Sequence, residues 1–178
     1  YYRLYDLKKS VQLIVTYPDT NVTTGGYVGS KMVTTTLPIY ATALQTALKN
    51  HIITHRSLLT NSVATTGNSN AGAGHVGYSN NWAWTDTLLS LMSEIQLYGS
   101  TVLSSSFFDT GERNTQFNLF RHNPAAKIAG QGHGGGRMWY WLSAVVSASA
   151  FALCYLIGLS HNNDASAEGC VRPYFLIG

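Results

Sequence analysis

The residues whose types and spacing best suit catalysis lie in the C-terminal third of the sequence, around a run of glycines. His133-Gly134-Gly135-Gly136 spells the oxyanion-hole tetrapeptide of esterases, whose backbone amides stabilise developing negative charge. An esterase also needs a serine on a sharp Gly-x-Ser-x-Gly turn, but the nearest candidate, at 158–162, lacks the second glycine. No histidine follows His161 to complete a triad. We therefore interpret 130–136 as a mobile glycine-rich loop and expect no enzymatic activity.

Metal binding and acid–base catalysis find equally little support. His51 and His55 would share a helix face, and this spacing can hold zinc, but the glutamate of His-Glu-x-x-His is missing and no third ligand is evident. Glu94, Asp109 and Glu112 could form an acidic pair for proton transfer, although we expect capping and salt bridging instead. The sequence therefore predicts no catalytic residue, no metal and no cofactor.

The composition narrows the class of protein. The chain has 178 residues, of which 45% are hydrophobic and only 11% are charged, so it is neither disordered nor a long coiled coil. Its net charge of +3 is spread along the chain, with no basic stripe that could follow a phosphate backbone. We therefore expect one folded domain, with or without a short arm, and no nucleic-acid partner.

Turn residues and hydrophobic spacing predict mixed α and β structure in the first half. Residues 1–36 are rich in Thr, Val, Tyr and Gly and are expected to form strands or an extended, β-rich N-terminal arm ahead of a main domain at 37–178. Pro38 suits the first turn of a helix that runs to about Asn50. A short strand at Leu58-Leu59 and a surface loop at 64–80 should follow. The helix should bury Tyr40, Ala43, Leu44, Ala47 and Leu48, which recur at helical spacing.

Short helices and apolar strands should alternate in the second half. Ser93-Glu94 can cap a short helix that begins at Ile95, and another helix is expected over 111–120, with Phe117 and Phe120 inward. The apolar residues of the stretch at 82–92 should be core, namely Trp82, Trp84, Leu88, Leu89, Leu91 and Met92.

Strand-like runs cover 138–151 and 171–177. This order of elements predicts an α+β fold. Residues 141–159 carry no charge and are just long enough for a transmembrane helix. Serines and a glycine lower the mean hydropathy of this run. The charged residues on its two sides show little of the asymmetry that orients a transmembrane helix. We therefore favour buried strands over a membrane span.

Cys154 and Cys170 lie in this region and could form one disulfide. Their spacing alone leaves the pairing open, and the chain has no Cys-x-x-Cys motif.

The segment between the two predicted strand regions has no periodic pattern. Leu153 to His161 fits neither a period of 2 nor one of 3.6 residues. A strand or loop that obeys no burial pattern could be one selected for contact with another molecule. Trp139 and Trp141 precede this segment and should supply rigid apolar anchors beneath it.

A resemblance to a known family rests on five stretches: NNWAWTD (80–86), LMSEIQLYGST (91–101), SSSFFDTGER (104–113), WYWLSAVVSASAFA (139–152) and NNDASAEGCVRPYFLIG (162–178). As a set they resemble the C-type-lectin-like variable proteins of diversity-generating retroelements, which are frequent in bacteriophages and prophages of gut bacteria. The resemblance implies a C-type-lectin-like fold. In that family a reverse transcriptase copies a template repeat with errors at adenines, and so replaces a variable C-terminal cassette.

The resemblance places the variable region at about 143–170. Trp139 and Trp141 fall outside the residue types that adenine errors produce from Asn codons, which fits a fixed scaffold, and Glu168 falls outside them too. Ser143, Leu153 and Cys170 depart from the residues usual in the family. The implied ligand-binding positions are Ser143, Leu153, Cys154, Tyr155, Leu156, Ile157, Leu159, Ser160, His161, Asn162, Ala167, Glu168 and Cys170.

A second set of residues should hold that variable surface in place. We expect Arg172 to be partly buried and to pair with Glu94, since an unpaired buried guanidinium would be costly. The structural positions are Trp82, Trp84, Glu94, Trp139, Trp141 and Arg172.

The function that this resemblance implies is recognition rather than catalysis. The domain is expected on a phage virion, on a tail fibre or the capsid surface, where its variable face binds a bacterial surface protein or glycan receptor. Other virion subunits are expected partners, and a homotrimer is one expected assembly. The alternatives are a capsid or tail structural protein without receptor binding, and an enzyme related to formylglycine-generating factors, whose usual paired cysteines are not evident here.

Overall fold

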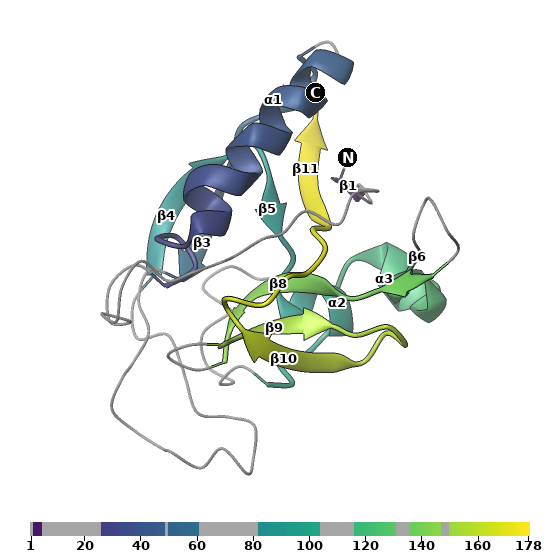
Figure 1. The fold of residues 1–178 in the computed structure, drawn as a ribbon. Coiled ribbons are helices and arrows are strands. Elements are labelled where there is room, and N and C mark those ends of the chain that lie inside the picture. Colours follow the sequence, from purple (N-terminus) through teal and green to yellow (C-terminus); the bar gives the residue numbers. More distant parts are fainter. Residues whose placement is uncertain are drawn as a thin grey trace.

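Small antiparallel sheets and few helices make up the computed structural model, which describes residues 2–4, 26–48, 50–60, 82–103, 116–130, 136–146 and 150–178 (Figure 1). The predicted α+β class is confirmed at this level. Expectations for Asp109, Glu112 and the segments 5–25, 64–80, 111–115 and 131–135 concern residues outside the described ranges.

The strands are short and lie mostly in the second half of the chain. They are β1 (Tyr2–Leu4), β2 (Ile52–Ile53), β3 (His55–Thr60), β4 (Trp82–Thr87), β5 (Ser90–Leu91), β6 (Ala129–Gly130), β7 (Arg137–Met138), β8 (Tyr140–Val145), β9 (Ala150–Cys154), β10 (Ser160–Asp164) and β11 (Pro173–Ile177). The helices are a π-helical turn, η1 (Met32–Thr36), then α1 (Leu37–Ala47), α2 (Glu94–Tyr98) and α3 (Asn118–His122), with a 3₁₀ turn, η3 (Pro124–Lys127).

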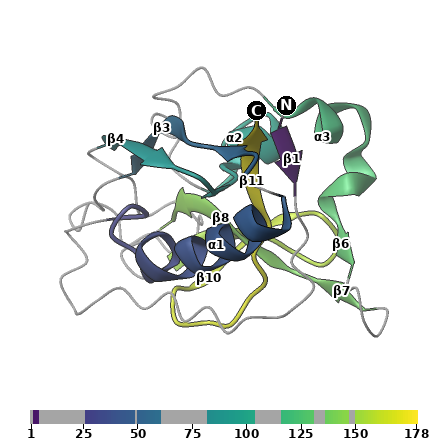
Figure 2. The same cartoon turned by 90° about the horizontal axis from the view of Figure 1, so that it is seen from above.

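The C-terminal strand β11 organises the first sheet. It pairs antiparallel with β1, β2 and β5, so the two ends of the described chain lie side by side (Figures 1 and 2). The first strand of the predicted N-terminal arm is therefore part of this sheet. Residues 26–36 form a turn and η1 rather than the predicted strands.

The remaining strands form a three-stranded sheet, β10-β9-β8, and two ribbons, β3–β4 and β6–β7. In Figure 2 the β3–β4 ribbon lies at the left of the view, and α3 and the β6–β7 ribbon lie at the right. The expected strand at Leu58-Leu59 is confirmed within β3.

Helix α1 begins near Pro38 as expected but ends earlier than predicted. It stops at Ala47, and Asn50 has a positive φ of 62°, which is incompatible with a continuing helix. Its fully buried residues are Leu37, Ala41 and Leu44, while Tyr40 and Leu48 are half-buried at the edge of the core. The predicted burial of Ala43 and Ala47 is wrong, because alanines on both sides of the helix gave no indication of the face that packs.

Helix α2 follows its sequence signal closely. Ser93 is the N-cap, and its hydroxyl accepts a hydrogen bond from the Gln96 backbone while the Gln96 side chain accepts one from the Ser93 backbone. Gly99 ends the helix in the left-handed conformation, with φ at 86°. The predicted cap is confirmed, with the first helical residue at Glu94. The predicted helix at 111–120 is wrong in its bounds, because residues 116–117 are not helical and α3 runs from Asn118 to His122. Phe120 is buried within α3 as expected, and Phe117, its N-cap, is half-buried.

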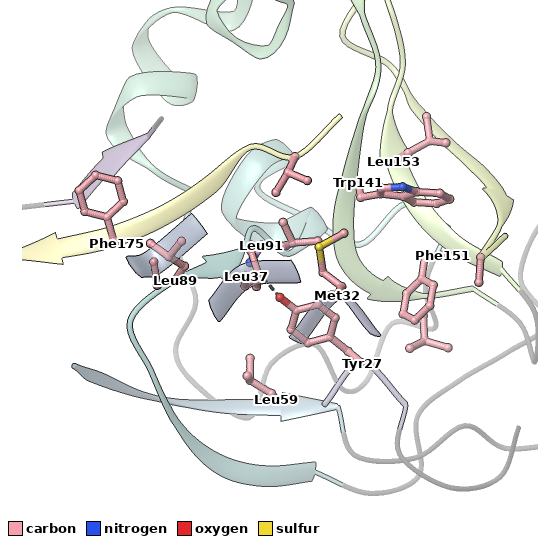
Figure 3. Close-up of a cluster of buried hydrophobic side chains, with 14 of the residues drawn as sticks. Tyr27, Met32, Leu37, Leu59, Leu89, Leu91, Trp141, Phe151, Leu153 and Phe175 are labelled. Atoms are coloured by element: carbon pink, nitrogen blue, oxygen red, sulfur yellow. Dashed lines mark hydrogen bonds between the residues drawn. The ribbon is translucent and has the colours of Figure 1, made fainter. Parts of the chain in front are cut away.

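Strands β8 and β9 are buried on both faces. One face packs Trp141, Phe151 and Leu153 into a cluster that includes residues of α1 and Tyr27, the first core cluster (Figure 3). The other face packs Tyr140, Leu142 and Cys154 against α2 and α3 in the second core cluster. Strands covered on both sides are apolar at successive positions, which explains why the uncharged run is apolar over 141–145 and 150–154. Among the residues that the structure describes, no helix has the length and apolar character needed to cross a membrane.

Trp84 is not a core residue. It is 60% exposed, because β3 and β4 form a ribbon and successive residues of β4 point to opposite faces. Trp84 and Asp86 share the outer face, where Asp86 pairs with Arg56 at 2.8 Å. Leu89, Leu91 and Met92, which follow, are buried as predicted, and Leu88 is half-buried.

Candidate functional site

The predicted variable segment forms a hairpin between β9 and β10. The Tyr155 amide donates to the Leu159 carbonyl and the Gly158 amide donates to the Tyr155 carbonyl, both at 2.8 Å. Gly158 has a φ of 83°, the left-handed conformation that closes a three-residue hairpin loop. A Cβ placed on Gly158 would lie 3.5 Å from side-chain carbons of Lys127 and Ile128, so these two residues pack against the loop. The hairpin is therefore held by defined backbone bonds.

Exposure alternates along this hairpin. We call Tyr155, Ile157, Leu159, His161 and Asn163 the exposed row, because all five side chains are exposed. The residues between them are buried or half-buried. The antiparallel register places His161 opposite Leu153 and Asn163 opposite Phe151, so these row residues lie on the sheet face of the first core cluster. On this face Phe151 and Leu153 are covered by the first core cluster, whereas His161 and Asn163 beside them are exposed.

One ring contact and local hydrogen bonds shape the row. The Tyr155 and His161 rings lie 5.4 Å apart, and His161 Nδ1 lies 2.6 Å from the Asn162 carbonyl oxygen. The Asp164 amide donates to Asn163 Oδ1 at 2.9 Å. Among the described residues β10 pairs only with β9, so its other edge is not covered by a strand. The two local bonds occupy backbone groups of β10, and the row therefore offers a partner its side chains rather than free backbone groups.

Four predicted ligand-binding residues are buried and cannot contact a ligand on the surface. Leu153 is 2% exposed within the first core cluster, and Cys154 is fully buried in the second. Ser143 lies in the middle of β8, where its amide donates to the Met92 carbonyl, and Cys170 lies beside Tyr140. The expectation that they face outward is wrong because β8 and β9 are covered on both sides. Both cysteines are free thiols, so the pairing that the sequence left open is not formed.

The other predicted ligand-binding residues are at least partly accessible. Glu168 is exposed, and Leu156, Ser160, Asn162 and Ala167 are half-buried. Asn163 belongs to the row, although the sequence analysis did not single it out. It lies two residues after His161 in the same strand, and alternate residues of a strand share a face.

The tryptophan scaffold is present, although Trp84 is not part of it. The Trp139 and Trp141 rings meet edge to face, with centroids 5.0 Å apart and planes at 85°. Trp141 is buried and Trp139 half-buried. Gly169, which is buried, lies directly against the Trp139 ring. Of Trp82, only the backbone is described.

The structure does not show the predicted pairing of Arg172 with Glu94. Arg172 is buried, as expected, but its Nη1 donates to the Ala126 carbonyl at 2.8 Å and to the Tyr140 hydroxyl at 3.4 Å. Its guanidinium also lies over the Phe120 and Tyr140 rings, 5.4 and 5.3 Å from their centroids. A backbone carbonyl, a tyrosine hydroxyl and two aromatic rings therefore lie around this cation.

The two histidines considered as zinc ligands do not share a helix. His51 follows the end of α1 and contacts the Gly178 carbonyl, whereas His55 begins β3. Among the described residues, no three histidines, cysteines or carboxylates are grouped as metal ligands would be. Both ring nitrogens of His55 are buried without a hydrogen bond, and its ring lies 5.3 Å from that of Tyr174. This burial lowers the pKa of His55.

We expect His55 to make stability depend on pH. Because its pKa is lowered from 6.5 in the folded state, the unfolded chain takes up the proton first as the pH falls below about 6.5. The free energy of unfolding should therefore decrease from pH 7.5 to pH 5, and less so in His55→Gln. Urea unfolding at several pH values measures both curves. Parallel curves for the two proteins would show that His55 titrates normally.

No known protein family, no curated protein and no solved structure matches the chain.

Proposed function

We propose that this chain is a recognition domain of C-type-lectin-like fold, carried on a phage virion and diversified by a retroelement. It binds a protein or glycan receptor on a bacterial surface through the exposed row. The observation that carries the proposal is the row itself, since alternate residues from 155 to 163 are exposed directly beside strands that are buried on both faces.

The chemistry of the row supports a contact surface. Ile157 and Leu159 are among the most exposed large apolar residues of the described chain. Neighbouring exposed apolar residues on a soluble protein often mark an interaction site. Tyr155, His161 and Asn163 add rings and hydrogen-bonding groups, a mixture that antibody paratopes also use.

The alternative function is structural packing within a virion, without receptor binding. Exposed Trp84 on the outer face of β3–β4 favours it, because this ring could pack against another subunit. In that case the row would also be covered by a subunit of the particle.

The proposal predicts that the row is needed for attachment to cells. Fluorescently labelled domain is incubated with a panel of gut bacteria, and bound fluorescence is measured by flow cytometry. The triple variant Tyr155→Ala/Ile157→Ala/Leu159→Ala should lose at least about tenfold in binding, as expected when anchor side chains at the centre of an interface are truncated. Its melting temperature should stay close to that of the wild type.

Ile39→Ala is the matched control, since Ile39 is an exposed apolar residue on α1 outside the row. It should leave binding unchanged. Binding by the triple variant at the wild-type level would refute the proposal. Self-assembly that the triple variant abolishes, without binding to any cell, would support the structural alternative.

A further inference from the structure

Glu94 is a carboxylate with no exposed surface, and it is bonded to the base of the hairpin that carries the exposed row. Its Oε1 accepts a hydrogen bond from the Ser160 hydroxyl at 2.7 Å. The backbone amides of Val102 and Leu103 donate to the same carboxylate at 3.0 and 3.1 Å. A buried charge is tolerated only when hydrogen bonds compensate its lost hydration, so these contacts fix its position.

These bonds join helix α2 and the segment just after it to Ser160, which lies 66 residues beyond Glu94 in the sequence. Glu94 is the first residue of α2, Val102 and Leu103 lie in the segment after that helix, and Ser160 is the first residue of β10. Ser160 lies between row residues Leu159 and His161 and pairs with buried Cys154 in the β9–β10 register. Its side chain points to the opposite side of the strand from theirs.

We infer that Glu94 is the positioning residue of the exposed row and that Ser160 is a fixed anchor rather than a variable contact. This inference rests on the proposed function only in calling the row a recognition surface. A hydrogen bond to an ionised group is stronger than one between neutral groups, so the bond to Glu94 favours a hydroxyl side chain at position 160. Serine and threonine offer a short hydroxyl donor there, whereas alanine offers none.

Ser160→Ala tests this role, with Ser160→Thr as the conservative variant. Hydrogen exchange of the Tyr155 and Gly158 amides, which close the hairpin, reports on its opening without any ligand. We expect exchange of both amides to become about 10- to 100-fold faster in Ser160→Ala, as loss of a bond to a charged group implies. Amides of β8 and β11 should keep their wild-type exchange, and Ser160→Thr should restore slow exchange in the hairpin.

Asn162→Ala is the matched control, because Asn162 is another half-buried residue of β10 whose side chain has no such anchor among the described residues. It should leave the exchange of the two hairpin amides unchanged. Unchanged exchange in Ser160→Ala, or failure of Ser160→Thr to restore it, would overturn the inference. Global unfolding of Ser160→Ala would overturn it too, since the hydroxyl would then support the whole domain.

The experiment separates this inference from the proposed function. Faster hairpin exchange in Ser160→Ala together with wild-type cell binding by the triple row variant would leave the anchor standing and refute recognition by the row. The reverse combination would refute the anchor alone.

Discussion

Leu153→Ala is expected to lower the free energy of unfolding by about 2–5 kcal/mol, the usual cost of truncating a buried leucine. Leu153 is 2% exposed and packs in the cluster that contains Trp141 and Phe151 (Figure 3). Removing its side chain leaves a cavity between β9 and the elements that cover it. Urea unfolding followed by circular dichroism measures the change.

Leu159→Ala, in the same hairpin, is the matched control for Leu153→Ala. Leu159 is 61% exposed, so its truncation should change the free energy of unfolding by less than about 0.5 kcal/mol. The two variants delete the same atoms from the same residue type, six positions apart. Similar losses in both would show that the row is part of the core.

Gly169→Ala should disrupt the tryptophan scaffold. A Cβ at this position would lie 2.1 and 2.2 Å from two carbons of the Trp139 ring, far closer than any stable contact. The ring must move away from Trp141, or the backbone at 169 must shift. We expect a loss of at least about 2 kcal/mol in the free energy of unfolding, within the range for overpacked cores. Near-ultraviolet circular dichroism should also change, because the edge-to-face tryptophan pair is broken.

Gly130→Ala provides the comparison for Gly169→Ala. No atom lies within 4 Å of a Cβ built on Gly130, so this variant should be as stable as the wild type. If Gly169→Ala were equally stable, Trp139 would not be fixed by close packing against residue 169.

Local signals in the sequence predicted local structure well. The cap of α2 could be foreseen because Ser93 and Gln96 bond to each other's backbone across three residues. The ends of α1 were less predictable, because alanines occur on its buried and exposed sides. Trp84 was misplaced because its exposure depends on β3–β4 being covered on one face, which residue type does not reveal.

The exposed row could be predicted only as a segment, not residue by residue. Exposure alternates along the hairpin, but residue type does not follow that alternation. Leu153 is buried and Leu159 is exposed, although both are leucines. Which of them is covered depends on distant elements that pack on β9. The partners of Arg172 and Glu94 were missed for a similar reason, since carbonyl oxygens, amides and rings brought together by the fold surround these charges.

Thiol labelling along the hairpin tests the central claim most directly, because the native Cys154 and Cys170 are buried internal references. Single cysteines are introduced at 155, 157, 159 and 161, and the labels added under native conditions are counted by mass spectrometry. Each introduced cysteine should react rapidly, while Cys154 and Cys170 react only after denaturant is added. Protection of the introduced cysteines to the level of Cys154, or rapid native labelling of Cys154 itself, would contradict an outward-facing row on a buried framework.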